Sequence, residues 1–206
     1  MLATVILAAG ALLATQAAGQ PPAPAPVSTL GGQSLAGWVV VLDPGHGGDD
    51  AGVEVGDLRE ARLTLELAQR TAAALTAQGA RVVLTREADE GPAPDTRAAT
   101  ANQAGGHVFI SLHFNRSRRP AASGAEIYTH AGGAAGLAAG TDGTGPAAHR
   151  LVLVPWDRVQ DRHAPAAEAL ATHLEMALGS RLPMSRHPRQ RLPFRALAGV
   201  DMPAVL

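Results

Sequence analysis

A continuously apolar run, Val39–Leu42, ends in Asp43-Pro44-Gly45 and is followed by a histidine in a glycine-rich turn. Because the run is apolar at every position rather than at alternate positions, it predicts a strand that is buried on both faces of a sheet. Pro44 and Gly45 end this strand, and the glycines allow backbone angles that a side chain would forbid. We therefore expect His46 at the carboxyl end of a central strand, where open α/β sheets place their ligand sites. The simpler alternative is a polar histidine on a surface loop.

Strand and helix patterns alternate along the chain after this turn. Apolar residues at helical spacing predict helices over residues 61–75 and 165–178, and Asp95 is expected to cap a third helix that ends near residue 103. Short β-rich runs predict strands at 81–85, 108–113, 125–129, 194–197 and 204–206, whereas 132–145 and 181–191 are interpreted as surface loops. Strands interleaved with helices favour a three-layer α/β/α domain.

The first 36 residues differ in composition from the rest of the chain. Residues 1–18 are apolar and then small, which is typical of a cleaved signal peptide, although an uncleaved membrane anchor is the alternative. Residues 19–36 contain four prolines close together and predict an extended linker, so the folded domain is expected at 37–206. Either interpretation places the domain outside the cytoplasm, as a secreted, periplasmic or cell-wall protein. After signal cleavage we expect no stable membrane span.

Composition excludes several classes of function. The formal net charge of the 206-residue chain is −1, which gives no electrostatic basis for binding nucleic acid. The sequence contains no cysteine, so a disulfide framework, a cysteine-ligated zinc site and a thiol nucleophile are all ruled out.

Three side chains form a candidate metal site at one edge of the predicted sheet. His46 follows the first strand, His113 ends the strand at 108–113, and Glu60 begins the first helix. Two imidazoles and one carboxylate are a typical catalytic zinc set, which leaves the fourth tetrahedral position for water. Four acidic residues between His46 and Glu60 could serve as ligands instead or be solvated loop charges: Asp49, Asp50, Glu54 and Asp57.

The order and spacing of six motifs resemble the zinc-dependent N-acetylmuramoyl-L-alanine amidases of the type-3 amidase family. The motifs are Leu42-Asp43-Pro44-Gly45-His46-Gly47-Gly48-Asp49; Glu60; Val83-Leu84-Thr85-Arg86 with Asp89; Arg97 with Ala101-Asn102; Ser111-Leu112-His113-Phe114-Asn115; and Gly124-Ala125-Glu126-Ile127-Tyr128. The resemblance runs from about Val39 to Leu206. It implies that His46, Glu60 and His113 bind Zn²⁺, that the sheet is mixed, mostly parallel and six-stranded, and that peptidoglycan is the substrate.

The resemblance fails at one functional position. Members of the family usually continue the Pro-Ala-Val-Leu sequence, here ending at Leu206, with Val-Glu, and that glutamate is the general base. We therefore expect a catalytic domain that is incomplete at its C-terminal end, with no catalytic base within the chain. Glu126 lies in a strand that the family carries for packing, so we do not expect it to replace the base.

Three functions stay open on these grounds. The first is zinc-dependent hydrolysis of the amide between N-acetylmuramic acid and L-alanine, which residues 1–206 by themselves would perform slowly or not at all. The second is a catalytically silent peptidoglycan-binding or regulatory module. The third is a zinc carboxypeptidase that acts on the stem peptide. An activator protein is a candidate partner of the amidase.

Several other polar residues receive supporting roles. Asp43 and Asn115 are candidates for orienting the metal ligands without binding the metal themselves, although a turn or strand-end hydrogen bond would also explain the presence of each residue. Arg86, Asp89 and Arg97 are interpreted as structural ion pairs. Three further arginines could border a glycan groove, but a solvated loop is the simpler explanation of them: Arg116, Arg118 and Arg119. The remaining histidines are interpreted as surface or capping residues: His107, His130, His149, His163, His173 and His187.

Overall fold

The computed structural model describes residues 34–116, 123–132 and 155–206. The predicted signal peptide and most of the linker lie outside these residues, and so does nearly all of the predicted loop at 132–145. Among the helices that are described, none combines the length and the apolar character needed to cross a bilayer.

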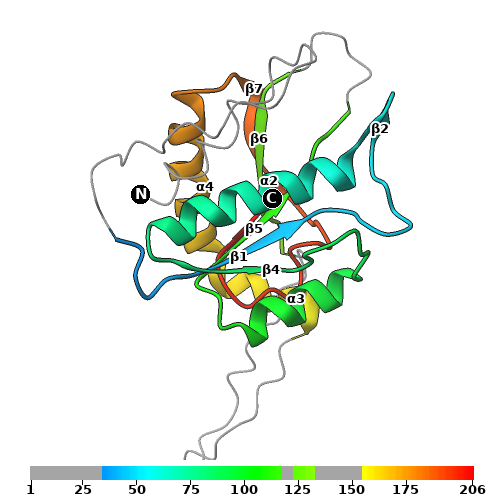
Figure 1. Ribbon diagram of the computed structural model, residues 1–206. Coiled ribbons are helices and arrows are strands. Elements are labelled where there is room, and N and C mark those ends of the chain that lie inside the picture. The colour runs from blue at the N-terminus through cyan, green and yellow to red at the C-terminus, as the bar shows by residue number, and fades with distance from the viewer. Residues whose placement is uncertain (1–33, 117–122, 133–154) are drawn as a thin grey trace, which may run out of the picture.

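A four-stranded parallel sheet forms the centre of the domain (Figure 1). Its strands are β1 (Val39–Pro44), β4 (Arg81–Leu84), β5 (Val108–Leu112) and β8 (Ala204–Val205), in the order β4-β1-β5-β8. Every residue of β1 and β5 is buried, which confirms the interpretation of the apolar run as a central strand. Because parallel strands end at one edge, the residues that follow β1 and β5 lie side by side.

Two further strands extend this sheet and make it mixed. β6 (Ala125–His130) and β7 (Met184–Leu192) pair in parallel. Tyr128 and Leu206 exchange backbone hydrogen bonds of 2.8 and 2.9 Å, which is the pattern of an antiparallel pair and joins β6 to the end of β8. The predicted six-stranded, mostly parallel sheet is thus confirmed. The interpretation of residues 181–191 as a loop is wrong, because β7 occupies most of that segment.

Helices cover both faces of the sheet. α2 (Glu60–Ala77) and α4 (Ala164–Gly179) bury Ala68, Leu75 and Leu174 against Val40 and Leu42 of β1. α3 (Pro94–Gln103) and the turns before β8 pack on the opposite face, where the buried side chains are Val41, Phe109, Ala98, Ala101, Leu197, Val200 and Met202. Alternate residues of β1 therefore face different helices, and the domain has the predicted α/β/α layers (Figure 1).

Two local predictions are wrong. Residues 194–197 form consecutive turns rather than a strand, because Leu197 and Val200 are buried in the second core cluster by a chain that bends back on itself. The N-cap of α3 is Ala93 rather than Asp95. Pro94 occupies the first helical position, where its missing N–H costs nothing, and Asp95 lies inside the first turn.

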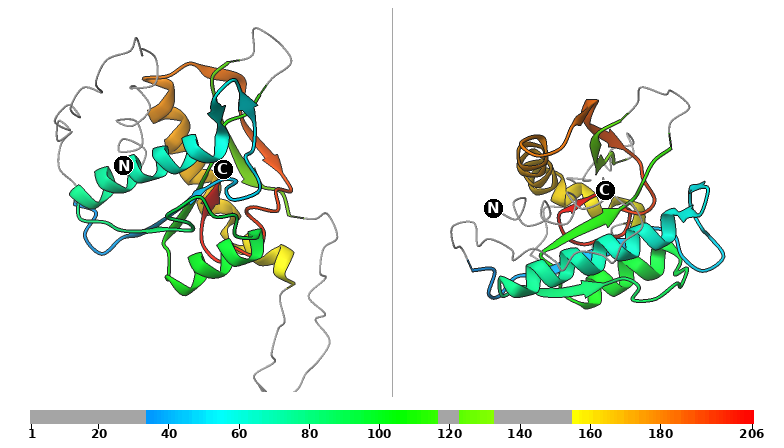
Figure 2. Two further views of the ribbon diagram at one scale, coloured as in Figure 1. Left: turned by 45° about the vertical axis from the view of Figure 1, so that its right-hand side comes forward. Right: turned by 45° about the horizontal axis from the view of Figure 1, so that its top comes forward.

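Two short elements escaped the sequence analysis. β2 (Glu54–Val55) and β3 (Leu58–Arg59) form a hairpin around Gly56 and Asp57, and it projects beyond the first turn of α2 (Figure 2). A 3-10 helix, η1 (Trp156–His163), precedes α4. The hairpin leads directly into Glu60, so it fixes where the first helix begins.

Candidate metal centre

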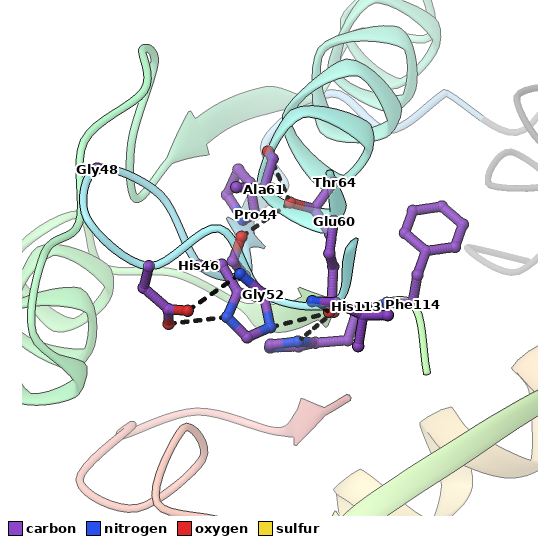
Figure 3. Close-up of polar contacts among 12 residues, drawn as sticks. Pro44, His46, Gly48, Gly52, Glu60, Ala61, Thr64, His113 and Phe114 are labelled. Carbon is purple, nitrogen blue, oxygen red and sulfur yellow. Dashed lines mark hydrogen bonds and ion pairs between the residues drawn. The ribbon is translucent and has the colours of Figure 1, made fainter. Parts of the chain in front are cut away.

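Three elements bring His46, Glu60 and His113 together (Figure 3). β1 and β5 are neighbours with Pro44 opposite Leu112, so the residues just beyond these strands lie at the same edge of the sheet. Glu60 is the first residue of α2, which covers this edge. The structure therefore groups the three residues for which the sequence predicted a metal site.

The distances within the group suit one small metal ion. Glu60 Oε1 lies 3.1 Å from His46 Nε2 and 3.0 Å from His113 Nδ1, and the three ligand atoms are all within 4.8 Å of one another. Tetrahedral zinc with bonds of about 2.0–2.1 Å separates neighbouring ligand atoms by about 3.3–3.4 Å. The two distances from Glu60 Oε1 to the histidine nitrogens are close to that value. A carboxylate oxygen and two imidazole nitrogens are also ligands that zinc prefers over calcium or magnesium.

Backbone groups hold the Glu60 carboxylate in place. Val53 donates its N–H to Oε2 at 2.9 Å, and Phe114 donates its N–H to Oε1 at 2.8 Å. Burial raises the pKa of Glu60, but these two hydrogen bonds and the nearby histidines outweigh it and leave the pKa below its usual value. Glu60 is 3% exposed and stays ionised, as a metal ligand must be.

His46 lies on a loop rather than on a regular element. Its φ is 60°, a left-handed conformation that is uncommon for a residue with a side chain. Two buried guanidinium groups hold this loop by its carbonyl oxygens: Arg86 donates to Pro44 and Gly45, and Arg97 donates to Pro44 and His46, at 2.7–2.9 Å. The prediction of an ion pair is confirmed for Arg97, which contacts Asp43 at 2.9 Å. Arg86 binds mainly backbone oxygens.

The two residues predicted to orient the ligands differ in the hydrogen bonds they make. Asp43 is buried and accepts hydrogen bonds from Thr85, Ser111 and Arg97, so it reaches His46 only through Arg97. Asn115 is exposed, and among the described residues it makes no hydrogen bond to the three ligands. A role for either residue in metal binding stays a prediction.

Asp50 is one of the four acidic residues that the sequence offers as alternative ligands or solvated loop charges, and it contacts the His46 ring directly. Its Oδ2 lies 2.8 Å from His46 Nδ1. The hydrogen bond to His46 is the main cause that lowers the pKa of Asp50 below its usual value. The sequence signal for this contact is a carboxylate that lies four residues after His46, across the Gly47-Gly48 turn. Glu54 instead pairs with Arg59, and among the described residues no other acid joins the group.

Glycine is required at two positions next to the ligands. A Cβ at Gly45 would overlap the His113 imidazole. Gly52 has a φ of 68°, and a Cβ there would lie 2.6 Å from His46 Cδ2 and 2.8 Å from Glu60 Oε2. The backbone therefore approaches the three side chains so closely that a larger residue at either position would displace them.

A cleft of about 520 Å³ opens beside the two histidines. The residues that line it include the turn at Gly47-Gly48, the segment 91–94, His46 and His113.

Among the described residues, the other histidines and Glu126 do not join this group. His130 is 8% exposed, so its interpretation as a surface or capping residue is wrong; the end of β6 buries it. His107 accepts a hydrogen bond from the Val39 N–H, whereas His149 lies outside the described residues. Tyr128 donates its hydroxyl to Glu126, and burial together with this contact raises the pKa of Tyr128 to about 12.

Comparison with known proteins gives consistent matches. A family model described as N-acetylmuramoyl-L-alanine amidase matches residues 40–206. The germination-specific N-acetylmuramoyl-L-alanine amidase of Bacillus subtilis is 36% identical over 108 residues, which cover 46% of this chain and 46% of that protein. AmiC of Neisseria meningitidis is 36% identical over 91 residues, which cover 44% of this chain and 22% of that protein. This chain therefore matches less than half the length of either relative.

Solved structures share the fold over most of the described residues. N-acetylmuramoyl-L-alanine amidase AmiC2 of Nostoc punctiforme aligns with a TM-score of 0.56 and 26% identity, over 82% of this chain and 77% of that one. The catalytic domain of CwlV from Paenibacillus polymyxa aligns with a TM-score of 0.52 and 24% identity, which is evidence for the fold alone.

Proposed function

Because this chain belongs to the N-acetylmuramoyl-L-alanine amidase family, we propose that it hydrolyses the amide bond between N-acetylmuramic acid and L-alanine in peptidoglycan. The observation that carries this proposal is the convergence of His46, Glu60 and His113 within 4.8 Å, inside the segment that the family model covers. The cleft beside the two histidines offers room for the stem peptide.

We propose that His46 Nε2, Glu60 Oε1 and His113 Nδ1 hold one zinc ion. Zinc in such a site lowers the pKa of a coordinated water to about 7 and polarises the amide carbonyl. The chain's own contribution is orientation: backbone N–H groups fix Glu60, and the carbonyl contacts of Arg86 and Arg97 fix the loop of His46. The three donors are thus set in place before a metal arrives, which lowers the entropy lost on binding.

The general base is a further part of this proposal. The resemblance to the family implies a glutamate at the second position after Leu206. β8 pairs with β5 in parallel, with Val205 opposite Ile110. If this register continues unchanged, that position lies opposite His113. The register therefore supports a base supplied from an extension of β8, and a general base contributes about 10²–10⁴-fold to the rate.

Identification of the liberated end group tests the reaction. Purified peptidoglycan treated with the zinc-loaded chain, and with a chain extended by the codons that follow Leu206, should release new L-alanine amino groups, faster with the longer chain. Free D-alanine would indicate a carboxypeptidase. Zinc binding and peptidoglycan binding without any new end group from either chain would indicate the silent module. Equal release by both would place the base within residues 1–206.

Export of the protein and its regulation are also proposals. We propose that residues 1–18 direct export to the cell wall or periplasm, as a peptidoglycan substrate requires, and N-terminal sequencing of the mature protein would test the cleavage site. The activator protein stays a prediction.

A further inference from the structure

We infer that Asp50 is a positioning residue that sets which nitrogen of His46 faces the metal. This inference rests on the proposed zinc site, and it assigns a role to a residue that is not one of the three proposed ligands. Its basis is a side-chain contact on the far side of the His46 ring.

The two nitrogens of His46 have different partners. Nδ1 lies 2.8 Å from Asp50 Oδ2, and Nε2 lies 3.1 Å from Glu60 Oε1. An ionised carboxylate can only accept a hydrogen bond, so Nδ1 must carry the proton. Nε2 is the atom that points toward Glu60 and His113, and it gives up any proton shared with Glu60 when a metal takes that place, so that its lone pair faces the metal while Nδ1 keeps its proton on Asp50.

Asp50 is itself fixed, although its side chain is 69% exposed. Its Oδ1 accepts the Gly52 N–H at 3.0 Å. Its backbone exchanges two hydrogen bonds with Gly47, from Gly47 N–H at 2.8 Å and from Asp50 N–H at 3.2 Å. The double-glycine turn closes on itself in this way and returns the carboxylate to the histidine that precedes it. The contact is therefore part of a folded loop rather than a chance approach of two surface side chains.

Removing the carboxylate should impair metal binding through the ring, without removing a ligand. Without an acceptor at Nδ1, the proton is free to move to Nε2, and the ring is free to rotate. Either change must be reversed before Nε2 can bind zinc. Outer partners of ligating histidines typically contribute about 10–100-fold to metal affinity.

Zinc affinity of matched variants tests the inference. We expect the dissociation constant, measured by competition with a chromophoric chelator, to rise about 10–100-fold in Asp50→Ala. Asp50→Asn keeps an acceptor oxygen but loses the charge, so its affinity should fall between wild type and Asp50→Ala. Asp57→Asn removes the same charge from the tip of the neighbouring hairpin and should match wild type. Equal weakening by Asp57→Asn and Asp50→Asn would overturn the inference, because general charge loss would then explain the effect.

The Nδ1 proton of His46 gives a readout that a merely structural role would not move. In the zinc-loaded protein, proton and nitrogen-15 spectra of the imidazole should show this proton exchanging with water more slowly in wild type than in Asp50→Ala, because Asp50 accepts it. Asp57→Asn should match wild type. Equal exchange rates in wild type and Asp50→Ala would refute the role of Asp50, whereas failure of the zinc site itself would appear as no zinc bound by wild type.

Discussion

The candidate metal centre is built in two different ways on its two sides. Glu60 is the first residue of α2 and His113 directly follows β5, so the hydrogen bonding of these two elements sets their positions. His46 has a left-handed backbone conformation within a loop, and the buried Arg86 and Arg97 hold that loop by its carbonyl oxygens. The loop side therefore depends on side chains distant in sequence, whereas the other side depends mainly on local backbone structure. Mutations should distinguish them.

The largest effect is expected from Arg97→Met. This change removes the donors to the Pro44 and His46 carbonyls and leaves the buried Asp43 carboxylate without its cation. Breaking a buried ion pair typically costs about 3–5 kcal/mol in the free energy of unfolding. Urea unfolding of the zinc-free protein should show this loss, and chelator competition should show weaker zinc binding.

Arg195→Met is the matched control for that change. Arg195 pairs with Asp95 at 3.6 Å, but its side chain is 76% exposed, so the loss should be at most about 1 kcal/mol. If the two arginine variants lost the same stability, the loop side would not depend on buried charge.

A smaller effect is expected from Gly52→Ala, which crowds both sides at once. The new Cβ would meet His46 and Glu60 in a left-handed backbone position, and such crowding costs about 1–3 kcal/mol. Gly56→Ala has a similar φ of 58° with nothing within 4 Å, so it isolates the backbone cost of about 1–2 kcal/mol. Zinc affinity should fall in Gly52→Ala and stay unchanged in Gly56→Ala. A fall in both would show that the hairpin, rather than contact with the ligands, sets the site.

The smallest effect concerns the pH dependence of the Glu60 side. The folded protein lowers the pKa of Glu60, so the stabilisation is fully present above its ordinary pKa of 4.5 and is lost as the pH falls through the lower folded value. Zinc-free wild type should therefore lose more unfolding free energy between pH 6 and pH 3 than Glu60→Gln does. A difference in unfolding free energy between the two proteins that stays constant from pH 6 to pH 3 would contradict the assignment of the ionised carboxylate.

The sequence predicted the elements that carry Glu60 and His113 because their signals are local. Apolar residues of β1, α2 and β5 are buried within the layers of the domain. Such burial shows in the sequence as a continuous apolar run for a central strand and as apolar residues at helical spacing for α2. Residues 194–197 also contain apolar side chains, but these are buried by turns rather than by a strand, so the same rule predicted a strand that the structure does not have there.

Features that depend on the edge of the sheet or on distant partners could not be predicted. β7 carries arginines and Pro188, which suit an edge strand but look like a loop in the sequence. The contacts of Arg86 with the Gly45 and Ala61 carbonyls leave no trace in the pattern of charges, because backbone oxygens are invisible in a sequence. Asp50 was indistinguishable from its acidic neighbours until the closed turn showed which carboxylate returns to His46.

The parallel pairing of β1 with β5 has a consequence for the assembly of the protein. His46 and His113 are 67 positions apart in the chain, and they become neighbours only after α2, β4 and α3 have crossed over and β5 has docked beside β1. Such distant pairings form slowly, because the cost of closing long loops comes first. We expect the proposed zinc ion to bind late, to a nearly finished domain, so that metal supply would govern how many molecules mature rather than whether the polypeptide can begin to fold.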